Sequence, residues 1–469
     1  GIGMGHYLVN NLPGKTFAIV DGRDAIGGTW DLFKYPGIRS DSDLHTFGYE
    51  FKPWTSDNAI ADAHEIMDYL YEVIDEDSLA RRMYLEHKVI RAEFDSRTAQ
   101  WTATVEHDGK QFDVTCDFLF GATGYYDYAQ GHAPHFEGQE DFAGEIVHPQ
   151  FWPEDLDYQG KQVVVIGSGA TAVTLIPAMA DDTAHITMLQ RSPSYVMPLP
   201  KQDPIANGLR KVLPDTVAYR VTRSINKGRQ RLIYGASQRY PKQVRRIIRA
   251  LNVKALPEGY DVDTHFNPKY NPWDQRMCAV PDSDLFTAIS QGKAEVVTDQ
   301  IERFTKTGIL LKSGRELQAD IIVSATGLKL QNLGGMELFV DGQPRRMGER
   351  MTYKGLMLQD VPNLAYLFGY INISWTLKVD QAADYLCRLL DEMKRRGVGV
   401  VTPRAPQGEM QAESVMAGLQ SGYVKRAEAG LPRQGRALPW RVLHHYEKDS
   451  AMYRAPVADA QALEWVAAA

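Results

Sequence analysis

Short apolar runs recur along the chain, and several of them are followed by a turn that contains glycine. They read FAIVD (17–21), DFLFGATGY (117–125), QVVVIGSG (162–169), HITMLQRS (185–192) and DIIVSATGL (320–328). Continuous apolar runs, as opposed to alternating ones, are typical of parallel strands that are buried on both faces. Helical patterns separate these strands, so we expect an α/β fold with parallel sheets.

Two separate glycine turns predict two dinucleotide-binding domains of Rossmann type. The pattern of Asp, apolar strand and Ala-Thr-Gly occurs at 117–124 and again at 320–327. We interpret the second copy as the return of the chain into the first domain, which is then discontinuous. The expected boundaries are 1–140 with 326–396 for the first domain, 141–160 for a linker, 161–325 for the second domain with a helical insertion at 205–256, and 397–469 for a C-terminal extension.

The strongest motif directly follows the strand QVVVI. It consists of Gly167, Ser168, Gly169, Ala170, Thr171, Ala172 and Val173. In the dinucleotide fingerprint the first glycine permits a tight turn and the second lets the pyrophosphate approach the backbone, while a small third residue allows close helix packing. The helix N-terminus then faces the phosphates. The strand–turn–helix context makes this a good predictor of nucleotide binding.

The next strand ends in Gln190-Arg191-Ser192 and not in an acid. An acid at this place would accept hydrogen bonds from a ribose 2′-hydroxyl, whereas Arg191 with Ser192 suits a 2′-phosphate. We therefore expect NADPH in preference to NADH. The competing interpretation is that Arg191 is a surface arginine without a ligand.

The opening of the chain, GIGMGHYL, is a second glycine-rich helix start that precedes the strand FAIVD. The fingerprint expects an acid about twenty residues beyond its glycines, and Asp21 stands at that distance from Gly1. We expect Gly1 to be the last glycine of a motif whose leading strand is missing, and Asp21 to hold ribose hydroxyls. A disordered glycine-rich tail is the alternative. If the missing strand prevents cofactor binding, the chain is a truncated binding module without activity.

Composition and charge narrow the class of protein. The 469 residues are 44% hydrophobic and 24% charged, with a net charge of −7, as in an ordinary soluble enzyme. The three cysteines, Cys116, Cys278 and Cys387, are too far apart in sequence to suggest a disulfide framework, a metal site or a redox pair. Neither a membrane-spanning run nor a secretory signal is recognisable, so we expect a cytoplasmic protein.

The segment 210–254 is an exception to the acidic composition. It holds thirteen Lys or Arg residues and one acid, Asp215, interleaved with aliphatic and aromatic residues. This pattern predicts basic amphipathic helices. A solvated face of a helical insertion is the preferred interpretation, and peripheral contact with the inner face of a membrane is the alternative. Nucleic-acid binding is disfavoured because the rest of the chain is acidic.

Several motifs resemble those of one enzyme family. GGTWDLFKYPGIRSDSD (27–43) resembles the flavin-contacting segment of class B flavoprotein monooxygenases. The fingerprint of type I Baeyer–Villiger monooxygenases is matched by Phe142, Gly144, His148, Trp152 and Pro153. The resemblance continues through YNPWDQRMC (270–278) and PNLAYLFGYINISWTLK (362–378), and PWR (439–441) is similar to the segment of thioamide-activating mycobacterial members.

The resemblance implies FAD in the first domain and NADPH in the second. It implies that a C4a-peroxyflavin converts ketones to esters or lactones, with molecular oxygen as the second substrate. Oxygenation of sulfides, thioamides or amines by the same intermediate is the alternative. Neither the physiological substrate nor the oligomeric state follows from the sequence.

The family's site residues map onto individual positions of this chain. Arg276 matches the active-site arginine, and Asp41 matches the carboxylate that partners it; a permanent cation suits anionic intermediates. By the same resemblance, His148 and Trp152 form part of a hinge. Trp375 either lines a substrate pocket or packs in the core. The residues expected near the flavin or the nicotinamide are Gly28, Thr29, Trp30, Asp31, Leu32, Arg39, Ser40 and Val89.

Overall fold

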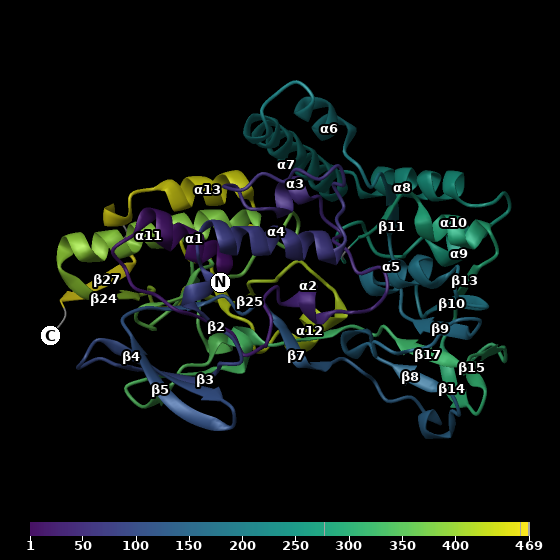
Figure 1. Ribbon diagram of the computed structural model, residues 1–469, viewed down its shortest axis with the longest axis horizontal. Coiled ribbons are helices and arrows are strands. Elements are labelled where there is room, and N and C mark those ends of the chain that lie inside the picture. The colour runs from purple at the N-terminus through teal and green to yellow at the C-terminus, as the bar shows by residue number, and fades with distance from the viewer. Residues whose placement is uncertain (276, 460, 468–469) are drawn as a thin grey trace.

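A computed structural model describes residues 1–275, 277–459 and 461–467. Figure 1 shows two lobes side by side, with helices α6 and α7 projecting above the middle of the molecule. One lobe contains the chain start, α11 and the C-terminal strands, and the other contains β8–β10 and β13–β17. The fold is α/β with parallel sheets, as predicted.

The core of the second lobe is a five-stranded parallel sheet within the described residues, with the order β13-β10-β9-β17-β8. Every neighbouring pair runs parallel, and Val164 of β9 lies between Thr187 and Ile322. The strands are β8 (Glu145–Val147), β9 (Gln162–Ile166), β10 (His185–Gln190), β13 (Ala294–Thr298) and β17 (Ile321–Ser324). Three of them were predicted from apolar runs in the sequence.

Both faces of this sheet are covered, which explains its continuous apolar runs. Helices α5 (Ala170–Met179) and α10 (Asp284–Ser290) cover one face, where Val163 and Val165 are buried. Their neighbour Val164 points to the other face, beneath a small antiparallel sheet. That sheet consists of β14 (Ile301–Thr305), β15 (Gly308–Leu311) and β16 (Glu316–Gln318).

Among the described residues, the first lobe holds two larger sheets and the strand pairs β1-β2, β24-β27 and β25-β26. One sheet has the order β20-β19-β3-β4-β5 and the other β21-β22-β23-β6. Their strands are β3 (Lys88–Asp95), β4 (Gln100–His107), β5 (Lys110–Cys116), β6 (Leu119–Gly121), β19 (Glu337–Val340), β20 (Gln343–Pro344), β21 (Thr352–Tyr353), β22 (Met357–Leu358) and β23 (Leu364–Tyr366). Because 119–121 pairs with 364–366, the lobe is assembled from two distant parts of the sequence.

The run FAIVD forms a shorter and more exposed strand than we predicted. Strand β1 (Ile19–Val20) pairs in parallel with β2 (Met83–Tyr84), which confirms the parallel direction. The side chain of Val20 is 37% exposed, so the prediction of a buried strand was wrong for this residue. The physical reason is that β2 is its only partner strand within the described residues, so its outer side is not covered by a sheet.

Helices of the first lobe pack beside its sheets. Helix α1 (Ile2–Asn11) contacts α4 (Ala63–Glu76) and α11 (Leu377–Arg396), and α13 (Tyr446–Arg454) packs on α11. Short helices α2 (Thr29–Leu32) and α3 (Leu44–Phe47) follow the strand β1. Met4 and Leu386 share a core with Met357, which ties the helices to the sheet.

Two adjacent segments connect the lobes. Strands β7 (Tyr126–Gly131) and β18 (Leu328–Leu330) pair in antiparallel fashion, and the amide of His132 donates to the carbonyl of Gly327. The crossings therefore lie side by side. Short 3-10 turns occur at η1 (Ala80–Arg82), η2 (Gln139–Asp141), η3 (Pro149–Phe151), η4 (Asn332–Gly335), η5 (Met347–Glu349) and η6 (Val457–Asp459).

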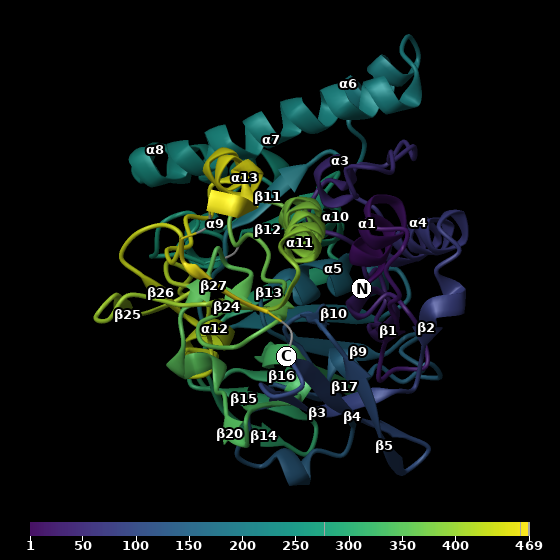
Figure 2. The same cartoon turned by 90° about the vertical axis from the view of Figure 1, so that its left-hand side faces the viewer.

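The insertion of the second domain is helical, as predicted. Helices α6 (Pro204–Arg210), α7 (Asp215–Arg239) and α8 (Pro241–Ala255) lie along one side of the molecule, which is the upper edge in Figure 2. They are followed by α9 (Val262–His265), and β11 (Val196–Leu199) pairs in parallel with β12 (Cys278–Pro281).

The C-terminal segment packs against the first lobe and is not a detached tail. Val401 and Leu463 belong to the core beneath α11. Its elements are β24 (Val398–Pro403), β25 (Met410–Ser414), α12 (Gly422–Ala427), β26 (Arg433–Gly435), α13 and β27 (Leu463–Ala467). The predicted domain boundaries remain a prediction, since the packing does not separate these units.

Candidate active site

The turn between β9 and α5 has the geometry that a dinucleotide needs. Gly167 adopts φ +135°, and a Cβ atom there would lie 2.4 Å from the carbonyl oxygen of Ala325. In contrast, nothing lies within 4 Å of a Cβ built on Gly169, which is exposed together with Ala170. Helix α5 has neither a side-chain cap nor an acid in its first turn. Its N-terminus therefore leaves amide groups open for an anion.

The other residues of the predicted turn either pack in the core or lie at the edge of the turn. Ala172 and Val173 are buried in the core of the second lobe. The hydroxyl of Ser168 lies 2.9 Å from that of Ser194. Thr171 is half-buried and borders a small cavity between the lobes.

Arg191 and Ser192 follow β10 and are exposed, next to the turn. The amide of Gly167 donates to the carbonyl of Leu189, which fixes the turn against this strand end. The structure thus places Arg191 at the rim of the predicted nucleotide site. Whether it binds a 2′-phosphate remains a prediction.

The glycines at the chain start allow close helix–strand packing. Cβ atoms on Gly1 and Gly5 would lie 3.2 and 3.1 Å from side-chain atoms of Ile19. Asp21 follows directly after β1, where its carboxylate accepts a hydrogen bond from the amide of Arg23 at 3.0 Å. The spatial relation of α1, β1 and Asp21 therefore fits a nucleotide-binding half-motif.

The predicted flavin segment forms a bent loop around α2. Arg23 donates to the carbonyl of Gly28 at 3.0 Å and pairs with the carboxylate of Asp31 at 2.5 Å. Thr29, Trp30, Asp31 and Leu32 are all half-buried. Because Arg23 holds the side chain of Asp31, this carboxylate fixes the shape of the loop and is not itself free to bind a ligand.

Val89 lies near the start of β3 and is half-buried. The amide of His87, directly before this strand, donates to the carbonyl of Asp21 at 2.8 Å. The start of β3 is thus tied to the predicted ribose acid. This placement is compatible with the expected adenine contact.

The three residues 39–41 have different surroundings. Arg39 forms an ion pair at 2.6 Å with Asp284 at the start of α10, and so ties the first lobe to the second. Ser40 is buried, and its hydroxyl donates to the carbonyl of Ser42. Asp41 is exposed, with the hydroxyl of Ser42 at 3.4 Å. The predicted partner of Asp41, Arg276, lies outside the described residues.

The fingerprint segment follows the crossing at β7 and is built into the second lobe. Phe142 and Trp152 are buried in cores on opposite faces of the second-lobe sheet, and Pro153 is half-buried. A Cβ on Gly144 would lie 2.2 Å from the carbonyl oxygen of Asp320, so close backbone approach requires glycine. These residues therefore anchor the segment to the second lobe.

His148 is placed where both lobes meet. It lines a small cavity together with Tyr35 of the first lobe, Thr171 of α5 and Gly327 of the return crossing. Its Nδ1 accepts from the amide of Gln150 at 3.2 Å. Burial lowers the pKa of His148, against the opposing effect of nearby backbone carbonyls, so the neutral ring is favoured. The position agrees with a hinge residue.

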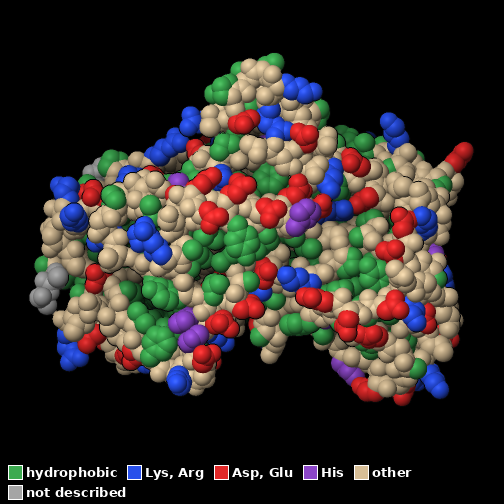
Figure 3. All heavy atoms as spheres, in the orientation of Figure 1, with side chains coloured by type: hydrophobic (Ala, Val, Ile, Leu, Met, Phe, Trp, Pro, Cys, Tyr) green, Lys and Arg blue, Asp and Glu red, His purple; other side chains and the backbone are tan. Residues whose placement is uncertain are grey.

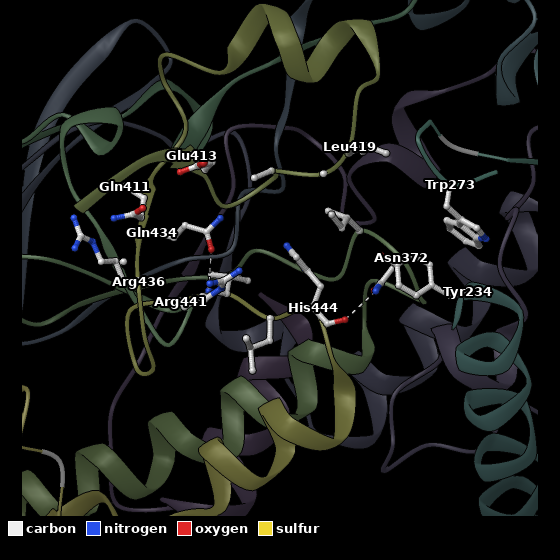
Figure 4. Close-up of a pocket in the computed structure, with 16 residues that line it drawn as sticks. Tyr234, Trp273, Asn372, Gln411, Glu413, Leu419, Gln434, Arg436, Arg441 and His444 are labelled. Carbon is white, nitrogen blue, oxygen red and sulfur yellow. Dashed lines mark hydrogen bonds between the residues drawn. The ribbon is translucent and has the colours of Figure 1, made fainter. Parts of the chain in front are cut away.

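A cavity of about 450 Å³ opens beside the segment that contains Arg276. Trp273 of that segment has φ +72°, a strained conformation for an aromatic residue, and stacks edge-on against Tyr234 of α7. Figure 4 shows these two rings at one side of the cavity and polar side chains at the other. The polar side chains belong to Gln411, Glu413, Gln434, Arg436 and Arg441.

Most of this cavity wall was missed by the sequence analysis. Several residues between 411 and 444 line it, although the C-terminal segment carried no periodic pattern. One signal was present: PWR places the buried Trp440 next to Arg441, which lines the cavity. Trp375, for which a pocket and a core position were both open, stacks on Tyr125 at 4.6 Å and packs in the core.

The cavity floor contains a histidine that is kept neutral. The Nε2 of His444 lies 2.7 Å from the carbonyl of Val415, so Nε2 is the donor, and the carbonyl of His444 accepts from Asn372. Burial and, secondly, the nearby Lys378 lower the pKa of His444 to about 3. Lys378 is itself buried. Protonation of His444 would place two cations together below the cavity.

This arrangement predicts acid sensitivity. In the unfolded chain the pKa of a histidine is about 6.5, so the unfolded state binds more protons below that pH and stability falls as the pH is lowered. From pH 7 to pH 5.5 we expect His444 to account for a loss of about 1–2 kcal/mol in the free energy of unfolding. Urea unfolding at the two pH values should show a smaller loss for His444→Gln. A His444→Gln variant with the same pH dependence as the exposed control His135→Gln would contradict the assignment.

Comparison with known proteins identifies the family. The model of the flavin-binding monooxygenase-like family matches residues 53–333. The chain therefore belongs to the flavin-binding monooxygenase-like family. The predicted family and its flavin cofactor are confirmed at this level.

Individual relatives agree with this result. The chain is 50% identical over 452 residues to the probable FAD-binding monooxygenase AlmA of Acinetobacter baylyi, covering 96% of this chain and 90% of that protein. It is 48% identical over 466 residues to the FAD-containing monooxygenase EthA of Mycobacterium tuberculosis, with coverage of 99% and 95%.

Solved structures share the fold at low sequence identity. An oxidized steroid monooxygenase bound to NADP matches with a TM-score of 0.79 at 22% identity, covering 100% of this chain and 97% of that one. An open structure of cyclohexanone monooxygenase matches with a TM-score of 0.78 at 20% identity, covering 99% and 97%. These likenesses confirm the predicted fold class.

Proposed function

We propose that the protein is an FAD- and NADPH-dependent Baeyer–Villiger monooxygenase that converts ketones to esters or lactones with molecular oxygen. One observation carries the proposal: the segment 142–153, anchored in the second lobe, brings His148 into one small cavity with Tyr35 and Thr171, where the two lobes meet. The names of the relatives and solved structures, which include FAD, NADP and cyclohexanone monooxygenases, support it.

The described residues fit both cofactors. At the second turn, the open space at Gly169 and the uncapped start of α5 suit a pyrophosphate, and Arg191 suits a 2′-phosphate. In the first lobe, Asp21, directly after β1, would hold the ribose, and the loop of α2 would contact the flavin. Bound NADPH supplies hydride and bound FAD supplies the oxygen-activating chemistry.

The protein's own residues position the substrate and stabilise charge. The cavity beside Trp273 is large enough for a small organic substrate, and its polar wall can orient a carbonyl group. Arg276, three residues beyond Trp273, offers a guanidinium that remains protonated while negative charge develops. Arg39 holds the lobes together through Asp284, and His148 couples their movement to the site.

Oxygenation of sulfur or nitrogen is a second candidate function for the same site. The cavity wall offers amide groups of Gln411 and Gln434 and the carboxylate of Glu413. These groups could hydrogen-bond to the N–H of a thioamide or an amine. A ketone has no N–H group and would leave the oxygen acceptors among these groups without a partner.

The distinguishing experiment compares products. Purified protein is supplied with NADPH, oxygen and either an aliphatic ketone series or a matched thioether and thioamide series, and the products are identified by mass spectrometry. We expect bound flavin in the absorption spectrum and an ester from at least one ketone. Sulfoxides without any ester would contradict the Baeyer–Villiger assignment, and a colourless protein that does not take up FAD would contradict both.

The role proposed for Arg276 predicts a separation of two activities. In Arg276→Lys, ester formation should fall about tenfold or more because a lysine lacks the planar, delocalised cation, while NADPH oxidation and bound FAD persist. Oxygen consumed without ester should appear as hydrogen peroxide. The exposed Lys269 lies in the same segment, so Lys269→Ala serves as the control. Equal ester yields from both variants would refute this role.

A further inference from the structure

Helix α7 is oriented against the usual rule that apolar side chains face the core. Its inner face is largely polar: Thr222, Arg223 and Asn226 are buried there, beside Ala218 and Tyr219. The guanidinium of Arg223 donates to the carbonyls of His45 and Gly48, and Asn226 donates to Asp43 and Asp203. Polar contacts therefore hold the helix to the molecule.

The outer face of α7 is apolar. Val217, Val221, Ile225 and Leu232 follow one another at helical spacing, and their exposed fractions are 42%, 38%, 42% and 73%. We call these four residues the outer stripe. Residues four apart and seven apart lie on one side of a helix, so the four side chains of the outer stripe share one face. Exposed apolar residues gathered on one face of a helix indicate a docking surface.

The surface continues along α8. Ile247 and Leu251 are 60% and 39% exposed, one turn apart on that helix. Helices α6, α7 and α8 lie along the same edge in Figure 2, and Figure 3 shows green and blue side chains, with some red ones, on the projection that α6 and α7 form. The exposed apolar residues thus extend over much of one edge of the molecule.

Cations flank the outer stripe. Arg220, Arg239, Lys242, Arg246 and Lys254 are exposed, and no salt bridge is formed by them within the described part of the chain. Only one acid, Asp215, occurs among thirteen Lys and Arg residues of 210–254. The charge of this edge is therefore complementary to an anionic surface.

We infer that the edge formed by α6–α8 docks on an anionic phospholipid bilayer, with the outer stripe of α7 inserted among the headgroups. Apolar residues on one side with flanking cations are the pattern of helices that lie in a membrane interface. None of the helices within the described residues is long and apolar enough to cross a bilayer. Docking parallel to the surface is the geometry that remains for α7.

The opposite side of the same helix faces the cavity of the candidate active site. Tyr234 of α7 lines the cavity and packs against Trp273. A bilayer under the outer stripe would therefore lie one helix away from the cavity wall. This arrangement, which rests on the proposed function, assigns a substrate class: ketones with long alkyl chains that partition into membranes.

Vesicle sedimentation tests the docking. Wild-type holoenzyme is mixed with vesicles of phosphatidylglycerol and phosphatidylcholine, or of phosphatidylcholine alone, over a sodium chloride titration. We expect sedimentation with the anionic vesicles at low salt, weakening as salt increases. The variant Val221→Ser, Ile225→Ser, Leu232→Ser should bind about tenfold more weakly.

A matched control separates this effect from a general loss of surface apolarity. Phe112 and Val114 are 42% and 41% exposed and lie on β5, the edge strand of the five-stranded sheet of the first lobe. The variant Phe112→Ser, Val114→Ser should bind vesicles like the wild type. Flavin absorbance shows that all variants are folded.

Three results would overturn the inference. The first is that the wild type does not sediment with anionic vesicles at low salt, and the second is that the outer-stripe variant binds these vesicles as strongly as the wild type. The third is a wild-type dimer in sedimentation velocity that becomes a monomer in the outer-stripe variant alone. The last result would mean that the surface binds a second copy of the chain.

Activity on two ketones separates the inference from the proposed function. The outer-stripe variant should lose about tenfold in rate on 2-tetradecanone carried in anionic vesicles and keep its rate on dissolved 2-hexanone. Equal rates of the variant and the wild type on both ketones would contradict the substrate class. Vesicle binding by a wild type that oxygenates neither ketone would confirm the docking and contradict the proposed function.

Discussion

Gly167→Ala should lower kcat/KM for NADPH by about 100-fold, because the change displaces the turn that faces the pyrophosphate. A Cβ there would lie 2.4 Å from the backbone oxygen of Ala325, and the φ of +135° is unfavourable for any residue with a side chain. The backbone cannot move aside as a flexible side chain could. A displacement of about 1 Å in a positioning element is enough for an effect of this size. Steady-state kinetics with varied NADPH measures it.

Gly169→Ala is the matched control within the same turn. Its φ is −84°, and nothing lies within 4 Å of the added Cβ, so the fold should keep its stability. The methyl group does occupy the space proposed for the pyrophosphate, so KM for NADPH should rise while the FAD spectrum is unchanged. If Gly167→Ala bound NADPH as the wild type does, the turn could not be the nicotinamide cofactor's phosphate site.

Arg223→Leu should destabilise the protein by about 3–5 kcal/mol, because it leaves a buried carboxylate without its cation. Arg223 and Asp380 form a buried ion pair at 3.0 Å, and the amide of Glu50 also donates to Asp380. Burial raises the pKa of Asp380 to about 7, and Arg223 is the chief influence that opposes this rise. Without the guanidinium, the carboxyl group takes up a proton at neutral pH. Urea unfolding gives the change in free energy.

Two further variants isolate the ion pair. Arg220 lies one turn earlier on α7 and is exposed, so Arg220→Leu should change the free energy of unfolding by less than about 0.5 kcal/mol. In Arg223→Leu with Asp380→Leu, the unpaired carboxylate is gone and part of the stability should return. A single variant no less stable than Arg220→Leu would show that the pair does not anchor α7.

Much of the second lobe could be predicted from the sequence, because its signals are local. The run at 162–166 is apolar throughout since the strand is buried on both faces, and the turn at Gly167 follows it directly. Both features arise within a dozen residues. The α/β class and the nucleotide turn followed from them.

The orientation of α7 could not be predicted in the same way. The sequence pattern favoured a solvated charged face, yet Arg223 and Asn226 are buried and Leu232 is exposed. The reason is non-local: the carbonyls of 45–48 and the carboxylate of Asp43 supply hydrogen-bond partners far away in the sequence. Amphipathic patterns indicate that two faces differ, and the partners decide which face is buried.

The cavity could not be predicted from the sequence for a related reason. Its wall combines Tyr234 of the insertion, Trp273 of the WDQRM segment and several residues between 411 and 444. Strands β24 and β27 pair with each other from opposite ends of the C-terminal segment. Its packing therefore depends on contacts between residues far apart in the sequence, which leave no local periodic pattern. Only the isolated PWR resemblance pointed to Arg441. Sites built from distant segments need the tertiary structure.

Labelled oxygen tests the central claim most directly. The holoenzyme is incubated with NADPH, ¹⁸O₂ and an aliphatic ketone, and the product is examined by mass spectrometry. Baeyer–Villiger oxygenation predicts an ester that carries one ¹⁸O atom in its single-bonded position, with one NADPH consumed per ester. NADPH oxidation that yields only hydrogen peroxide or labelled sulfoxides, and no labelled ester from any ketone, would contradict the proposed function.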